Sequence, residues 1–129
     1  MDRKYYIAGI LFGLIGILIG AFGAHGLKPL LTTEALTTLE TGVKYQMYHA
    51  LLLILLGILV HNGQQFPKAL FYLLIIGLIL FSGSIYLLAS NELTTIDFRA
   101  LGLATPLGGS LLIISWAWLL VHFITLKKK

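Results

Sequence analysis

The chain has 129 residues, of which 58% are hydrophobic and 11% charged, and its formal net charge is +4. A soluble globular domain carries about 25% charged residues and roughly 45–50% apolar ones, so a chain this short and this apolar needs lipid as its solvent. It contains no cysteine, which excludes disulfides, thiolate metal ligands and cysteine nucleophiles. The length fits a single domain over residues 1–129.

Four apolar stretches follow one another along the chain, at about 5–26, 43–60, 69–89 and 100–124. Each reaches or nearly reaches the roughly 20 residues that a helix needs to cross the hydrocarbon. None has Asp, Glu, Lys or Arg in its interior. Because backbone groups in lipid must be paired within the protein, these stretches are helices, and no short alternating segments of a barrel appear. The sequence predicts an all-α, four-helix integral membrane bundle.

Glycines form a regular stripe in the first stretch. They recur at spacings of 4, 3, 4 and 3, at Gly9, Gly13, Gly16, Gly20 and Gly23. This period keeps the glycines on one helix face, where a neighbouring backbone can approach closely. The stripe therefore predicts a tight contact between the first helix and another helix.

The segment between the first two stretches has a helical pattern of its own. Leu36, Leu39 and Val43 are spaced at i, i+3 and i+7, and Thr37 and Glu40 have the spacing of a capping box. We expect a short interfacial helix here, between spans one and two.

Basic residues are distributed unequally between the two sides of the predicted bundle. One side carries six, namely Arg3, Lys4, Lys68, Lys127, Lys128 and Lys129, and the other carries three, namely Lys28, Lys44 and Arg99. The richer side belongs in the cytoplasm, so both termini are expected inside and the loops 27–43 and 90–99 outside. Since the basic residues stand at the edges of apolar runs, they are expected to contact anionic lipid headgroups rather than nucleic acid.

Polar residues gather toward the outer leaflet in all four predicted helices. The candidate cluster for binding comprises His25, Lys44, Tyr45, Gln46, His49, Ser82, Ser84, Tyr86 and Thr105. Each has a simpler explanation: His25 caps a helix end or meets headgroups, Lys44 extends to the interface, and the tyrosines anchor the helices there.

His49 is the member that most needs a partner. It lies about 9 Å below the predicted start of its helix at about 1.5 Å per residue. We expect a hydrogen bond, direct or through one water, to at least one of Gln46, Ser82, Ser84, Tyr86 and Thr105. An interhelical hydrogen bond and a binding or proton-handling role both remain open.

Pro106 is expected to bend the outer part of span four. Proline removes a backbone donor and would leave the carbonyl of Gly102 unpaired, and Gly108 and Gly109 follow closely. A packing kink and a site lined by free backbone are both compatible with this pattern.

Enzyme motifs are missing from the sequence. It contains no HExxH, Gly-x-Ser-x-Gly or P-loop pattern, and no acidic residue lies within a span. No catalytic residue, metal ligand or cofactor is assigned, and an enzyme is disfavoured. His25 and His49 are the candidates for a haem or metal pair, although they belong to different helices at different depths.

Four ordered motifs resemble a known family. They are Gly20-Ala21-Phe22-Gly23-Ala24-His25-Gly26-Leu27, Tyr45-Gln46-Met47-Tyr48-His49, Phe81-Ser82-Gly83-Ser84-x-Tyr86 and Thr105-Pro106-Leu107-Gly108-Gly109. Together they resemble domain-of-unknown-function family 423, a family of uncharacterised bacterial membrane proteins, over nearly the whole chain. The resemblance implies a small four-helix protein of the bacterial plasma (inner) membrane and adds no catalytic assignment.

We therefore predict a non-enzymatic membrane module that binds a lipid, a small molecule or a partner protein through the outer-leaflet cluster. Membrane lipids are the expected partners, and a homo-oligomer or a partner membrane protein is left open. One alternative is an oligomeric small-solute transporter or channel subunit. The other is a histidine-based cofactor carrier or enzyme.

Overall fold

The computed structural model describes residues 2–91 and 102–126, which form four α helices. They are α1 (Asp2–His25), α2 (Thr33–His61), α3 (Lys68–Ala89) and α4 (Ala104–Ile124). Each is long enough and apolar enough to cross a membrane. The predicted all-α membrane bundle is confirmed.

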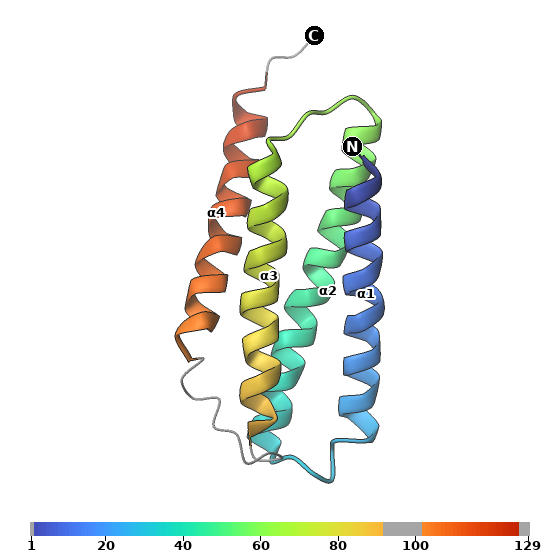
Figure 1. The fold of residues 1–129 in the computed structure, drawn as a ribbon, viewed down its shortest axis with the longest axis vertical. Helices are drawn as coiled ribbons and strands as arrows, with labels where there is room; N and C mark the ends of the chain where they lie inside the picture. Colours follow the sequence, from blue (N-terminus) through green and yellow to red (C-terminus); the bar gives the residue numbers. More distant parts are fainter. Residues whose placement is uncertain (1, 92–101, 127–129) are drawn as a thin grey trace.

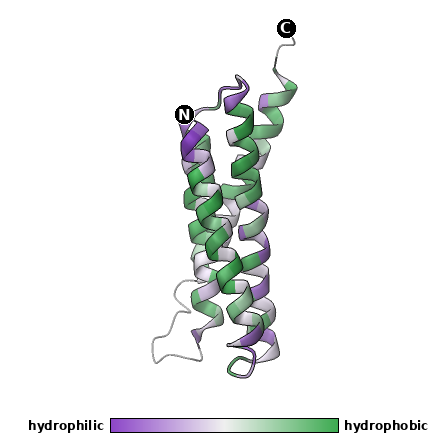
Figure 2. Ribbon diagram, turned by 90° about the vertical axis from the view of Figure 1, so that its right-hand side faces the viewer, coloured by the Kyte–Doolittle hydropathy of each residue, from purple (hydrophilic) through white to green (hydrophobic). Residues whose placement is uncertain are grey.

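The helices run alternately up and down and pack in chain order, α1 against α2, α2 against α3 and α3 against α4 (Figure 1). The start of α1 and the end of α4 lie at the same end of the bundle, which we call the termini end. Hydrophobic residues cover most of the helix length, and hydrophilic residues gather toward the ends (Figure 2).

Helix α2 is longer than the second apolar stretch. It begins at Thr33, and the hydroxyl of Thr32 accepts a hydrogen bond from the backbone N–H of Ala35 at 3.0 Å. Thr32 is thus the N-cap, whereas Thr37, expected in that role, lies within the helix. The expected interfacial helix is the first part of α2 rather than a separate helix. Gly42 does not interrupt it, because Gly42 is buried against α3.

Helix α4 begins later than predicted. Its first residue is Ala104, while residues 100 and 101 lie outside the described residues. Pro106 is therefore the third helical residue, where a backbone N–H has no partner within the helix in any case. The expectation of a freed carbonyl within span four was wrong, because Pro106 stands in the first turn and helps to start the helix.

Glycines bring α1 close to α2. Gly9, Gly16 and Gly23 are buried. A methyl group on Gly9 would lie 2.8 Å from the carbonyl oxygen of Ala50, a backbone atom that cannot move away alone. The tight contact predicted from the stripe is confirmed, with its closest points at every seventh residue.

A second glycine contact joins α3 to α4. Gly108 faces the backbone of α3 so closely that an added Cβ would lie 2.7 Å from the carbonyl oxygen of Gly77 and closer still to the amide nitrogen of Phe81. Its neighbour Gly109 has ordinary room, since an added Cβ would lie 3.4 Å from the ring of Phe81.

The apolar core occupies the half of the bundle nearer the termini end. Its most enclosed members are Leu53, Leu56, Leu70, Leu74 and Leu78 from α2 and α3. Leu112 and Leu119 complete it from α4, and Tyr5 completes it from α1. The polar side chains described next therefore lie at mid-depth and toward the other end.

The two adjacent glycines of α4 provide a matched test of the α3–α4 contact. We expect Gly108→Ala to lower the free energy of unfolding by about 1–3 kcal/mol, because the methyl group has no space. Gly109→Ala should be neutral or stabilising by up to about 1 kcal/mol, as expected for glycine replaced within a helix. Thermal melts of the purified variants in detergent compare them, and equal shifts in melting temperature would contradict the contact.

Candidate functional site

Four of the five buried polar side chains among the described residues fall into three groups whose hydrogen bonds cross between helices, while the fifth, Ser115, donates to the carbonyl of Leu111 within α4. The first surrounds Gln46, the second contains the two serines of α3, and the third surrounds His49. Which helices each group joins determines the structural role of the cluster.

Gln46 links three helices. Its side chain is 3% exposed. Its Nε2 donates to the backbone carbonyl of Phe12 in α1 at 2.7 Å, and its Oε1 accepts from the hydroxyl of Tyr86 in α3 at 2.5 Å. Gly16 lies beside the amide, and an added Cβ there would be in ordinary contact with Nε2 at 3.4 Å but would lie 2.8 Å from Sδ of Met47. The glycine stripe of α1 thus packs directly against the part of α2 that carries Gln46.

The serines of α3 form the second group. Ser82 donates to the carbonyl of Gly42 in α2 at 2.9 Å. Ser84 shares a 2.5 Å hydrogen bond with the hydroxyl of Thr105 in α4, and it also donates to the carbonyl of Phe81 at 3.0 Å. Since both serines are buried, these bonds provide partners that lipid would not.

His49 has a partner on each ring nitrogen. Nδ1 lies 2.7 Å from the carbonyl oxygen of Tyr45, and Nε2 lies 3.0 Å from Nε1 of Trp116 in α4. An indole N–H only donates, so Nε2 accepts and Nδ1 carries the proton that it donates to the Tyr45 carbonyl. The geometry therefore fits a neutral imidazole with both nitrogens paired.

The partner of His49 and its distance from the start of its helix both differ from the sequence-based expectation. No hydrogen bond described within 2–91 and 102–126 joins His49 to the five partners expected for it, and Trp116 was missed. His49 lies sixteen residues after the first residue of α2, about 24 Å along the axis rather than 9 Å, because the helix starts at Thr33. The available signal was a tryptophan inside an apolar run, away from the interface where this residue usually lies.

Two candidates, His25 and Lys44, are exposed and lie apart from these groups, whereas the exposed Tyr45 belongs to the His49 group through its carbonyl. His25 is at the end of α1, thirteen residues after Phe12, and so about 20 Å along the axis from the Gln46 amide. Lys44 faces outward and borders a small hollow between α1 and α2. Tyr45 contributes its carbonyl to His49, while its ring packs edge-on against Phe81 with centroids 5.3 Å apart.

A groove opens beside His49 on the lipid-facing side of α2, α3 and α4. Its volume is about 300 Å³, and it is lined by Tyr45, His49, Phe81, Gly109, Leu112, Ile113 and Trp116. Trp116 is 49% exposed, so its ring forms an outer wall while its N–H contacts His49. The lining is mainly aromatic and aliphatic, and its polar side chains are the phenol of Tyr45 and the imidazole, whose nitrogens are already paired.

Metal ligation finds little support in this arrangement. Over residues 2–91 and 102–126, no group of three or more His, Cys, Asp or Glu side chains is placed to hold a metal ion. His25 and His49 are separated along the bundle axis and do not form a pair of axial ligands.

The family follows from comparison with known proteins. A family model described as "Protein of unknown function (DUF423)" matches residues 19–109. The chain therefore belongs to the DUF423 family. The matched range contains all four motifs that carried the resemblance and all nine candidate residues.

Relatives in the DUF423 family resemble the chain over nearly their full length. A UPF0382 membrane protein of Staphylococcus haemolyticus is 38% identical over 119 residues, covering 92% of this chain and 93% of the relative. The UPF0382 membrane protein YwdK of Bacillus subtilis is 38% identical, with coverage of 92% and 94%.

A third relative, the UPF0382 inner membrane protein YgdD of Escherichia coli K12, is 35% identical, with coverage of 99% and 95%. No solved structure matches the chain. With four helices able to span a bilayer, the chain is a membrane protein of a family without an assigned activity.

The hydroxyl of Tyr86 provides a direct test of the Gln46 group. We expect Tyr86→Phe to lower stability by about 1 kcal/mol, within the range of roughly 0.6–2 kcal/mol for hydrogen bonds between membrane helices, because Gln46 loses a partner. Tyr48→Phe is the matched control, since Tyr48 is exposed and its variant should stay within about 0.5 kcal/mol of the original. Chemical or thermal unfolding in detergent measures both, and a stability loss no larger than that of the control would count against the bond.

Proposed function

We propose that the chain is a non-enzymatic module of the bacterial plasma membrane that holds the acyl chain of a membrane lipid in the groove beside His49. One observation carries the proposal: the polar cluster is paired internally, whereas the groove next to it is open and apolar. We thus assign the predicted binding role to the groove rather than to the polar cluster that borders it.

The lining of the groove favours a hydrocarbon occupant. Trp116 and His49 lie near the middle of α4 and α2, a depth at which acyl chains are the surrounding solvent. Gly109 has no side chain and leaves the floor of the groove open between the helices. The aromatic walls offer contact area to an acyl chain, and the imidazole, whose nitrogens are both paired, has no free donor for a polar ligand.

The paired cluster counts against the transport alternative. A transporter needs polar groups that exchange partners along a path, and those of a proton carrier must change protonation. Protonation of His49 at Nε2 would end its bond with Trp116, because that nitrogen could then no longer accept. The bond supports a static role, in which His49 holds α4 against α2.

The proposed orientation has both termini in the cytoplasm. Arg3 and Lys4 begin α1 and Lys68 begins α3, so all three lie at the termini end. An excess of Lys and Arg favours the cytoplasmic side. The groove and the cluster are then at mid-depth and toward the outer leaflet.

Filling the groove tests lipid binding. Gly109→Leu puts an aliphatic side chain into the groove, and its Cβ would make only ordinary contact with Phe81. We expect at least a several-fold loss of the lipid that copurifies with the protein, measured by native mass spectrometry after gentle detergent extraction. Gly83→Leu is the control, because Gly83 has nothing within 4 Å of an added Cβ and does not line the groove. Equal lipid content in the two variants would refute the site.

Reporter fusions test the orientation. Fusions after Lys129 and within 62–67 should report the cytoplasm, and a fusion within 27–32 should report the outside, as expected from the distribution of basic residues. Alkaline phosphatase activity and green fluorescence give opposite readouts for the two sides. An external C terminus would reverse the proposed orientation and move the cluster to the cytoplasmic leaflet.

A further inference from the structure

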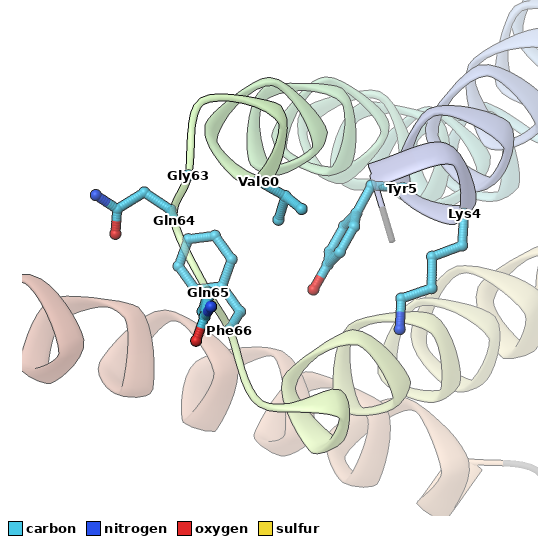
Figure 3. A pocket seen from close by; sticks show the side chains of 7 residues that line it. All are labelled: Lys4, Tyr5, Val60, Gly63, Gln64, Gln65 and Phe66. Carbon is cyan, nitrogen blue, oxygen red and sulfur yellow. The ribbon is translucent and has the colours of Figure 1, made fainter.

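A second pocket lies at the termini end, far from the groove. Its volume is about 420 Å³, and it is bounded by Lys4 and Tyr5 of α1, Val60 of α2 and the connection 63–66 (Figure 3). This is where the apolar spans give way to polar residues, so the pocket lies at the level of lipid headgroups.

Tyr5 brings a hydroxyl without a partner into this pocket. The residue is 3% exposed, yet within the part of the chain that the structure describes no hydrogen bond joins its hydroxyl to the protein. Figure 3 shows the oxygen pointing into the space between the connection and Lys4. Because the hydroxyl opens onto the pocket and no described group of the protein occupies it, the side chain is suited to donate to an acceptor that enters.

Lys4 brings a positive charge that no carboxylate neutralises among the described residues. Its Nζ lies 4.7 Å from the ring centroid of Phe71 and 5.6 Å from that of Tyr5, so aromatic faces hold it in place. The neighbouring carboxylate of Asp2 is occupied by Nδ1 of His61 at 3.0 Å. The ammonium group is thus positioned and free to attract an anion.

We propose that this pocket binds a phosphate group, with the Lys4 ammonium and the Tyr5 hydroxyl as its two donors. The volume exceeds that of phosphate alone and leaves room for the substituents of a phosphodiester headgroup, while Val60 and Phe66 provide apolar contact. A lipid headgroup and a free phosphate share this chemistry. The site does not depend on the proposed groove, because it uses no groove residue and lies at another depth.

Binding to the full-length protein in detergent tests the site. The probes are short-chain phosphatidylglycerol, inorganic phosphate and uncharged diacylglycerol, and the measurement is affinity by native mass spectrometry or thermal shift. We expect phosphatidylglycerol to show saturable binding. Uncharged diacylglycerol, which lacks the phosphate, should show no saturable binding. Lys4→Gln and Tyr5→Phe should each weaken phosphatidylglycerol binding about fivefold or more, the effect of losing one hydrogen bond.

Matched control variants distinguish binding at a specific site from non-specific electrostatic attraction. Arg3→Gln removes the same charge from the adjacent residue, which is exposed and does not line the pocket, and Tyr6→Phe removes a neighbouring hydroxyl. Both should keep the original affinity. Equal weakening by Arg3→Gln and Lys4→Gln would show diffuse attraction and overturn the proposal.

The probes also identify the source of the phosphate. Binding of phosphatidylglycerol alone, lost in Lys4→Gln and Tyr5→Phe, supports a lipid headgroup. Competition by inorganic phosphate with the same dependence on both residues supports a phosphate site that free ions enter. Binding of neither, or binding that both variants retain, would overturn the site while leaving the groove to be judged by its own variant.

Discussion

How closely two backbones approach decides which helices of this protein form pairs. In hydrocarbon, helices gain little by burying apolar side chains against each other, because lipid tails are equally apolar, so close packing and hydrogen bonds must hold them together. Gly9 brings α1 to the backbone of α2, and Gly108 brings α4 to that of α3. The bundle is therefore two glycine-packed helical hairpins, each made from neighbouring elements of the chain.

Polar side chains then join one hairpin to the other. Tyr86 of α3 bonds Gln46 of α2, Ser82 of α3 bonds the α2 backbone, and Trp116 of α4 bonds His49 of α2. Each of these contacts crosses between the hairpins, where side chains, among them Tyr86 packed against Gly42, fill the space between the backbones. Hydrogen bonds are directional, so they fix the register of the two hairpins in a way that apolar contacts alone do not.

Sequence patterns predicted the features that are local in the chain. Hydropathy predicted the four spans, and the spacing of Gly9, Gly16 and Gly23 predicted a close contact face, because both depend on residues within one helix. The distance of His49 from the start of its helix was misjudged because hydropathy detects the apolar part of α2, whereas the helix begins at the Thr32 cap. The Trp116 partner was missed because it depends on how the two hairpins dock, which no spacing within one helix encodes.

The paired cluster has a consequence for recognition by this protein. A buried polar group that already has its partners can accept a ligand only by giving one up, and loss of the bond made by Tyr86, Ser82 or Trp116 would loosen the contact between the hairpins. A ligand can bind without such a loss where the protein has a free hydrogen-bond donor. It can also do so where the ligand is apolar and needs no donor. The Tyr5 hydroxyl and the Lys4 ammonium meet the first condition, and the apolar groove beside Trp116 meets the second. The groove borders the polar cluster, whereas the Lys4 and Tyr5 pocket lies at the termini end away from it, so a ligand in either site would leave the bonds between the hairpins in place.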